Sequence, residues 1–445
     1  WKIEKIFLIL SLIIGTLYIF ILPVGRAPDE ASHFYRIYEL TTGHFVSSIS
    51  DDGIIGSMEP SDIEIIGDFK ENNVTYTEII NSLNLYPNEE NQTFIHTSAY
   101  SYNIFSYLPH TIGMLIGKSL NLPLLVTTYI AKAFNLVTCI LILYLCIKFI
   151  PLFKKTVLFI SFLPITMQAM ASLSPDGLTI ASSIALISFV LYLTYSYKKE
   201  LSKKQTSLLF VICLFLSMSK IAYAPICLFL FTIPKERFGS TKRKLITIIA
   251  MGSIVLVTLL AWLFIAPSVQ SAYDSSAQIS TIISNPLKYL AIVLHSLSAN
   301  ATMYISGLLG GYLEWFNVVL SPIYTIASFV IFILLCNKEK QIVITKTTKF
   351  LSIAIFAIIT MITFTTMFIQ WTKTGETIID GVQGRYFLPI ILFVPIWFLP
   401  TGKSTASSPA QRKARPLKTP QNYYLYGFVI FESIYAITTI ACTHL

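Results

Sequence analysis

The sequence predicts an all-α polytopic membrane protein with about eleven transmembrane helices, several interfacial helices and a long first external loop. Two observations carry this prediction. The chain of 445 residues is 54% hydrophobic and only 12% charged, whereas soluble domains carry about a quarter charged residues. The apolar residues also form runs that are long enough to span a bilayer, at 6–24, 122–147, 245–267 and 350–369.

Basic residues give the predicted helices a direction. Most of the 32 Lys and Arg residues lie in clusters at 2–5, 148–155, 198–204, 235–244, 338–349 and 403–418. The positive-inside rule places all of these clusters on the cytoplasmic side. The amino terminus is then inside, the carboxyl terminus is outside, and the chain crosses at 5–24, 123–147, 156–173, 177–197, 206–219, 222–234, 245–266, 320–336, 350–370, 386–400 and 423–441.

Two apolar segments, 100–118 and 287–311, are not counted as crossings. A single crossing by 100–118 would turn every later basic loop outward, so both are expected to be interfacial or re-entrant helices. The expected parts are a first transmembrane helix, an external loop with interfacial helices and a catalytic acid, a transmembrane core, a cytoplasmic linker that touches anionic lipid, and a last helix. Their ranges are 1–24, 25–121, 122–400 (with external loops at 267–319 and 371–385), 401–422 and 423–445.

Several familiar kinds of site have no motif in this chain. The six cysteines lie in apolar runs and are expected to pack as small apolar side chains. No zinc motif, P-loop or dinucleotide fingerprint occurs, and the glycine-rich stretch 307–311 follows no predicted strand. The sequence therefore predicts neither a metal ligand set nor a nucleic-acid partner.

Two adjacent carboxylates, Asp29 and Glu30, follow the first predicted crossing. Charged groups at a membrane helix mouth are expensive to keep without a use. If Pro28 opens a helix, Asp29, His33 and Arg36 recur at i, i+4 and i+7 on one face. That face suits proton abstraction beside an anionic group, although the two acids also simply favour the positive end of a helix dipole.

Further polar residues lie at external ends of predicted helices. Asp176 follows Ser174 and Pro175 in a complete helix-start motif, which structure alone explains. Lys220, with Tyr223 nearby, lies at an external turn. A lysine there either extends its charge to the membrane surface or holds a phosphate as a point charge.

Arg385 lies in the segment Gly-Val-Gln-Gly-Arg-Tyr-Phe-Leu-Pro at 381–389, next to Gln383 and Tyr386. Its positive charge is unfavourable there for two reasons: it lies on the predicted external side, against the positive-inside bias, and at the positive amino end of a helix dipole. A residue that breaks two local preferences invites a functional interpretation, and a guanidinium grips a phosphate through two hydrogen bonds. The alternative is a structural ion pair with Asp380 or Glu376.

Two other places combine carboxylates with aromatic residues. Asp274 follows Tyr273 in the loop after the crossing at 245–266, and Glu314 precedes Trp315 after the glycine-rich stretch. Aromatic faces and carboxylates suit sugars, so either place fits the lining of a sugar pocket. An ordinary loop explains both equally well.

These residues predict one class of reaction. Asp29 takes a proton from a hydroxyl acceptor, and the acceptor attacks a carbon whose leaving phosphate is stabilised by Arg385, Lys220 or Arg36. Nucleotides are not available outside the membrane, so the predicted donor is a sugar on a polyprenyl phosphate. A single displacement would invert the anomeric centre.

The same motifs resemble the signature stretches of a bacterial membrane family, domain of unknown function 2142. The similarity covers Pro28-Asp29-Glu30 with His33, the stretches around Asp176 and Lys220, and 381–389, and it runs from about residue 5 to residue 400. That family is similar in turn to the GT-C superfamily of integral membrane glycosyltransferases. The resemblance therefore implies a GT-C-like fold in the bacterial cell membrane with an extracytoplasmic active site.

In the GT-C superfamily one Asp of the first external loop is the catalytic base, which implies that role for Asp29 with Glu30 as its neighbour. The implied substrates are a polyprenyl-phosphate sugar and a cell-wall or other surface glycan. The known phosphate-binding positions do not align with Lys220 or Arg385, so those assignments rest on chemistry, and use of a divalent metal stays open. A lipid-linked glycan flippase or transporter and a polysaccharide polymerase or ligase are the alternatives, and no oligomeric state is indicated.

Overall fold

The computed structural model describes residues 2–71, 74–267, 274–338, 342–402 and 421–445. Most of the described chain is helical. The α-helices are α1 (Ile3–Ile21), α2 (Glu30–Thr41), α3 (Ile65–Glu71), α4 (Tyr76–Asn81), α5 (Ile104–Ser119), α6 (Leu124–Phe149), α7 (Lys154–Phe162), α8 (Pro164–Met170), α9 (Asp176–Tyr195), α10 (Lys203–Ser219), α11 (Thr241–Ile265), α12 (Ser275–Ser284), α13 (Pro286–Ala299), α14 (Ala301–Leu308), α15 (Pro322–Asn337), α16 (Lys346–Trp371), α17 (Val394–Trp397) and α18 (Gln421–Thr443). The 3₁₀ helices are η1 (Ser61–Glu64), η2 (Ile221–Thr232), η3 (Lys235–Arg237) and η4 (Gly384–Phe393).

Short strands complete the fold. They are β1 (Ser48–Ile49), β2 (Ile55–Pro60), β3 (Gln92–His96), β4 (Tyr312–Leu313) and β5 (Val318–Val319). The first three form an antiparallel sheet in the order β1-β2-β3, and β4 pairs with β5. Gly56 lies opposite both Ser48 and His96, which fixes the register of the three-stranded sheet.

Among the described residues, six helices are long and apolar enough to cross a membrane, which does not bear out the predicted count of eleven. They are α1, α6, α9, α11, α16 and residues Tyr423–Thr443 of α18. The other five predicted crossings fall on shorter or interrupted elements. The predicted helix 156–173 is divided between α7 and α8 because Pro164 opens α8 and lacks the N–H needed to continue α7. Pro225 and Pro389 lie inside η2 and η4, where 3₁₀ structure replaces the predicted α-helices, and α10 and α15 have only 17 and 16 residues.

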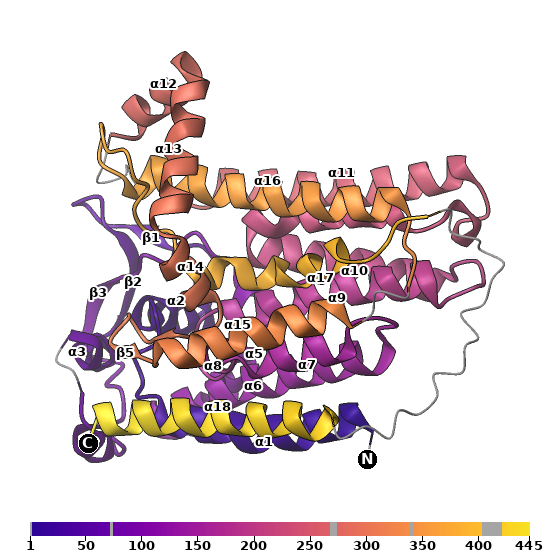
Figure 1. Cartoon of the computed structure of the whole chain (residues 1–445). Coiled ribbons are helices and arrows are strands. Elements are labelled where there is room, and N and C mark those ends of the chain that lie inside the picture. Colours follow the sequence, from indigo (N-terminus) through magenta and orange to yellow (C-terminus); the bar gives the residue numbers. More distant parts are fainter. Residues whose placement is uncertain (1, 72–73, 268–273, 339–341, 403–420) are drawn as a thin grey trace.

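The segment between α1 and α5, which the sequence predicts to be the first external loop, folds into a cap at one end of the helix bundle. Figure 1 shows the long helices lying roughly parallel, with α2, α3 and the β1–β3 sheet at one end and the amino terminus at the other. The cap has a hydrophobic core of its own, in which Phe34, Ile37, Ile66 and Ile95 are almost fully buried. Burial of these side chains explains why an otherwise acidic segment is ordered.

Several connections that carry basic clusters meet one another. The amide of Leu201 donates to the carbonyl of Arg237 (2.7 Å), and the amide of Ile344 donates to that of Pro400 (3.0 Å). The first contact brings two basic clusters, 198–204 and 235–244, to the same end of the bundle, and the common cytoplasmic side of all the clusters stays a prediction. The predicted cytoplasmic linker lies almost entirely in 403–420, outside the described residues.

Segment 100–118 forms most of α5, which packs along α6 as a helical hairpin. Gly113 and Gly117 make this close approach feasible: a Cβ on Gly113 would lie 2.8 Å from the Cα of Ala131, and one on Gly117 would lie 2.6 Å from Oγ1 of Thr127. Small residues four apart are a common way for membrane helices to pack closely. The other segment, 287–311, contains α13 and α14.

We expect Gly113→Ala to destabilise the protein by about 1–3 kcal/mol, because the added methyl group forces α5 away from α6. Gly252→Ala is the matched control, since Gly252 is also helical but nothing lies within 4 Å of a Cβ added there. It should be neutral or slightly stabilising. The apparent melting temperatures of the two variants in detergent test this difference, and equal effects would contradict it.

Candidate active site

Asp29 lies immediately before α2, where the chain leaves the first transmembrane helix. It is the N-cap residue, with a left-handed backbone (φ 61°, ψ 10°), and its carbonyl accepts the amide of His33 (3.0 Å). The helix therefore begins at Glu30, and the prediction that Pro28 opens it is wrong. Asp is one of the residues that tolerate this backbone conformation, and the resulting turn leaves the Asp29 side chain 42% exposed.

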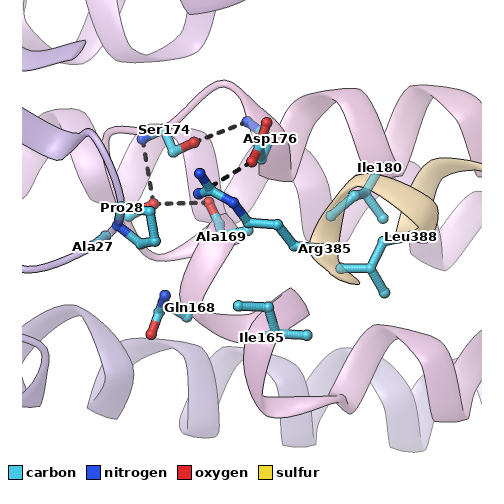
Figure 2. A pocket seen from close by; sticks show the side chains of 11 residues that line it. Ala27, Pro28, Ile165, Gln168, Ala169, Ser174, Asp176, Ile180, Arg385 and Leu388 are labelled. Atoms are coloured by element: carbon cyan, nitrogen blue, oxygen red, sulfur yellow. Dashed lines mark hydrogen bonds and ion pairs between the residues drawn. The ribbon is translucent and has the colours of Figure 1, made fainter. Parts of the chain in front are cut away.

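Arg385 connects Asp29 to a second carboxylate. Its Nη2 lies 3.1 Å from Oδ2 of Asp29, and its Nη1 lies 3.5 Å from Oδ2 of Asp176. The Arg385 side chain is only 10% exposed. Figure 2 shows the guanidinium reaching from η4 toward Asp176 at the start of α9. Among the described residues, Arg385 forms its ion pairs with Asp29 and Asp176 and not with Asp380 or Glu376, the alternative partners that the sequence offered.

Lys220 completes a row of alternating charges. Its Nζ lies 2.9 Å from Oδ1 of Asp176, so Asp176 is shared by two cations. Burial opposes the charged ammonium, but the adjacent Asp176 carboxylate outweighs it and raises the pKa of Lys220 well above its usual value. The row Asp29–Arg385–Asp176–Lys220 joins the segment before α2 to α9, α10 and η4.

Tyr386 provides an aromatic surface beside both cations. Its ring centroid lies 5.3 Å from Nζ of Lys220 and 5.4 Å from Cζ of Arg385, distances at which a cation is attracted to the ring face. The Tyr386 carbonyl accepts the hydroxyl of Tyr223 (2.8 Å). The structure thus brings together both tyrosines that the sequence singled out.

Glycines explain how these elements approach one another. A Cβ on Gly384 would collide with the backbone of α14 at Tyr304 and Leu308, so only glycine fits directly before Arg385. A Cβ on Gly177 would lie 2.6 Å from the carbonyl oxygen of Ala169, where α9 begins against the end of α8. The two glycine-containing motifs are therefore close-packing sites that set the positions of Arg385 and Asp176.

His33 lies near this row, close enough for its charges to act on the imidazole. It is buried, and its Nδ1 is 2.6 Å from the hydroxyl of Tyr107, with the Tyr102 ring against its edge. Burial lowers the pKa of His33 to about 4, so at neutral pH it is an uncharged hydrogen-bonding group. The sequence analysis did not select Tyr102 and Tyr107, because segment 100–118 read as an apolar helix. The polar residues Tyr107 and His110, three apart within it, were the available signal.

Glu30 lies next to Asp29 in sequence but points into the protein. It is fully buried and accepts the amides of Gly25 (2.9 Å), Ala27 (3.2 Å) and Leu173 (3.1 Å). Its Oε1 also lies 3.1 Å from Nζ of Lys132 in α6. These contacts fix the turn before Asp29, which makes Glu30 a positioning residue and does not fit the catalytic role predicted with Asp29.

Arg36 does not reach the candidate site. It is fully buried in the cap, where Nη1 pairs with Glu39 (2.6 Å) and the other nitrogens donate to the carbonyls of Tyr102 and Phe45. The predicted role in holding the donor phosphate is therefore wrong. The expected shared face of Asp29, His33 and Arg36 does not form. Asp29 precedes the helix, and all three guanidinium nitrogens of Arg36 donate hydrogen bonds within the cap.

Four other residues that the sequence predicted for the site do not join the row of charges. Buried Glu314 pairs with Arg26 (3.2 Å) and His444 (2.7 Å), and the ring of Trp315 lies 5.6 Å from Nζ of Lys70. Asp274 caps α12 by accepting the amide of Ala277, while Tyr273 lies outside the described residues. Gln383 is the half-buried N-cap residue of η4, two positions before Arg385.

A small pocket lies beside Arg385 and Asp176. Its free volume is about 10 Å³, which is room for about one water molecule. Its walls, shown in Figure 2, combine polar and apolar side chains: Ala27, Pro28, Ile165, Gln168, Ala169, Ser172, Ser174, Asp176, Ile180, Arg385 and Leu388. In this structure Arg385 and Lys220 contact the carboxylates of Asp29 and Asp176 and do not face an open cavity.

The polar side chains of the candidate site are not arranged like the ligands of a metal ion. Arg385 separates the two nearest carboxylates, Asp29 and Asp176. Within the described residues, no group of three or more His, Cys, Asp or Glu side chains is arranged to hold a metal ion.

A family model described as a predicted membrane protein (DUF2142) matches residues 12–394. The chain belongs to this family. The resemblance of the sequence motifs to this family is thus confirmed, while the similarity to the GT-C superfamily stays a prediction. The matched region of this DUF2142 protein includes the whole row from Asp29 to Arg385. No curated protein and no solved structure matches the chain.

We expect Asp176→Asn to destabilise this DUF2142 protein by about 3–5 kcal/mol, because two mostly buried cations lose their shared counter-ion. Asp29→Asn should have a much smaller effect, since the Asp29 carboxylate is partly exposed and Arg385 keeps Asp176. Thermal unfolding in detergent compares the two variants. A similar loss of stability in both would contradict the central place given to Asp176.

A pH series should reveal the burial of His33. The unfolded chain binds a proton on His33 below about pH 6.5, whereas the folded protein resists it until about pH 4. The contribution to stability is therefore complete above pH 6.5 and is lost as the pH falls toward 4, by up to about 1.4 kcal/mol per pH unit. His33→Gln should show a shallower loss over this window, and identical pH profiles would refute the assignment.

Proposed function

We propose that this protein is a GT-C-type glycosyltransferase that moves a sugar from a polyprenyl phosphate to an extracytoplasmic glycan by a single inverting displacement. The observation that carries the proposal is the ion pair between Asp29, a partly exposed carboxylate, and Arg385, a nearly buried guanidinium. A general base must be reachable by its substrate, and a guanidinium in a low-dielectric site binds phosphate strongly.

The geometry suggests how donor binding prepares the base. In this structure Arg385 Nη2 is engaged by Asp29, and Nη1 is oriented by Asp176. A donor phosphate oxygen that replaces Asp29 at Nη2 would keep Arg385 in place and release the Asp29 carboxylate. Asp176 would hold Arg385 and Lys220 throughout, since it contacts both cations.

The proposed transfer takes place in one chemical step. Asp29 accepts the proton of the acceptor hydroxyl while that oxygen attacks the anomeric carbon of the donor sugar. The bond between this carbon and the phosphate oxygen breaks, and Arg385 and Lys220 stabilise the charge that develops on the leaving polyprenyl phosphate. The attack and the departure occur on opposite sides of the carbon, so its configuration inverts.

The position of the site in the bundle supports chemistry on the outer face. Asp29 lies where the chain enters the cap, while the amino terminus lies at the opposite end of the bundle. With the basic connections on the cytoplasmic side, the cap and the site are extracytoplasmic. A polyprenyl donor in the outer leaflet would approach such a site from the membrane.

Transport of a lipid-linked glycan was the main alternative from the sequence. Transporters commonly place charged residues near the bilayer midplane to bind their cargo. Lys132, one of two charged residues deep in predicted crossings, is fully buried and paired with Glu30. It holds the turn before Asp29. The other, Glu432 in α18, is also fully buried and accepts the hydroxyl of Tyr324 (3.3 Å). Neither residue offers an open binding position, which favours transfer over transport.

Asp29→Asn tests the proposal directly. Purified protein would be given synthetic polyprenyl-phosphate sugars and a panel of wall glycans, and product would be quantified by mass spectrometry. The variant should lose transfer by about 10²–10⁴-fold, the usual contribution of a general base. Asp274→Asn is the matched control, because it changes an external carboxylate at another helix cap and Asn caps a helix equally well.

Arg385→Ala separates donor binding from acceptor binding in the same assay. It should raise the KM for the polyprenyl-phosphate sugar much more than the KM for the glycan. Full activity of Asp29→Asn, or an Arg385→Ala effect confined to the acceptor KM, would reject the assigned roles.

A further inference from the structure

The cap contains a second and larger hollow, at its junction with the connection between α5 and α6. The free space there is about 140 Å³, against about 10 Å³ beside Arg385 by the same measure. A single water needs only about 10–15 Å³ on this scale, so this pocket has room for a larger ligand. The side chains that could bind one are those of Tyr38, Tyr86, Glu89, Lys118 and Asn121.

The polar groups of this pocket are held in place. Nζ of Lys118 lies 3.6 Å from the centroid of the Tyr38 ring and donates to Oγ1 of Thr41 (3.2 Å). The hydroxyl of Tyr38 donates to Oε1 of Glu89 (3.4 Å). An ammonium, a carboxylate and an aromatic ring are thereby held close together, while Tyr86 is 53% exposed.

The surroundings of the pocket select the charge of a ligand. Between residues 51 and 90 the cap carries ten acidic residues against Lys70 as its one base. Glu59 and Asp62 lie close enough to Tyr38 to raise the pKa of its hydroxyl together with Glu89, although burial is the larger cause. This negative field disfavours phosphate and other anions. Hydroxyl groups, by contrast, can donate to Glu89 and accept from Lys118.

We propose that this pocket binds an uncharged saccharide unit of the acceptor glycan. In this subsite the sugar ring lies against Tyr86, its hydroxyls donate to Glu89, and the Lys118 ammonium and the Asn121 amide contact its oxygens. The name acceptor subsite rests on the proposed glycosyltransferase function. The binding of an uncharged saccharide does not depend on it.

The position of the subsite relative to Asp29 fits an extended acceptor. Asp29 precedes α2 and Tyr38 lies nine residues further along the same helix, a separation of about 14 Å along the axis. A glycan chain held at Tyr38 and Tyr86 would need to extend by a few sugar units to bring a hydroxyl to Asp29. Short acceptors would then be poor transfer substrates, because a chain held at the subsite would not reach Asp29.

Binding without turnover tests the subsite. Purified full-length protein would be titrated by calorimetry with uncharged tri- to hexasaccharides and with glycerol-phosphate oligomers of similar length. We expect an uncharged saccharide to bind, with Tyr86→Ala and Glu89→Gln each weakening it by tenfold or more. Glu90→Gln is the matched control, because Glu90 is an adjacent exposed acid that does not line the pocket, and its affinity should stay unchanged.

The outcomes separate this inference from the proposed function. Absence of saccharide binding, preference for the glycerol-phosphate oligomers, or equal effects of Glu89→Gln and Glu90→Gln would overturn the subsite. If transfer occurs but Glu89→Gln leaves the acceptor KM unchanged, the subsite is wrong and the transferase proposal survives. If saccharide binding follows the expected pattern while no donor supports transfer, the subsite survives and the proposed function fails.

Discussion

The candidate site depends on the sharing of Asp176 between two cations. Asp176 lies at the start of α9 and holds Lys220 from the end of α10 and Arg385 from the start of η4. Each of these groups would be costly to bury alone, and each is neutralised by its neighbour. Asp29 is the one member of the row with substantial exposure, so the solvent-accessible carboxylate lies at one end of the row. The rest of the site follows from this arrangement, because Tyr386 and Tyr223 pack around cations whose positions are already fixed.

Close backbone contacts allow this row to form inside a helix bundle. Gly384 meets the backbone of α14, and Gly177 meets the end of α8, so the residues that follow or precede them in sequence arrive at one place. Proline adds a second constraint, since η2 and η4 contain Pro225 and Pro389 and remain 3₁₀ helices. Elements that are short and interrupted therefore surround the site, while the long uninterrupted helices form the frame. The same division between frame and site recurs in membrane proteins that place non-helical backbone around a cavity.

Buried ion pairs also connect the cap to the bundle at two other points. Glu30 accepts three backbone amides and pairs with Lys132, which ties the turn before Asp29 to α6. Glu314 pairs with Arg26 and with His444 near the carboxyl terminus. Both pairs restrict the segment from which Asp29 projects, so the candidate base has a defined position relative to Arg385. They also explain carboxylates that looked like substrate ligands in the sequence and that instead position the backbone.

The sequence by itself determined the class of the protein and the family, and it singled out Asp29, Asp176, Lys220, Tyr223, Arg385 and Tyr386, which the structure brings together. Composition, charge bias and short motifs are local properties, and they predict which residues break a local preference. Only the tertiary structure decided which of these residues meet. Glu30 and Arg36 carry the same chemical groups as Asp29 and Arg385, yet the cap and α6 bury them with other partners. The helix count failed for a similar reason, because packing around prolines and glycines shortens or divides helices that hydropathy alone would extend. Whether a charged side chain faces a substrate or a structural partner depends on contacts between residues far apart in the chain, and no local pattern records those contacts.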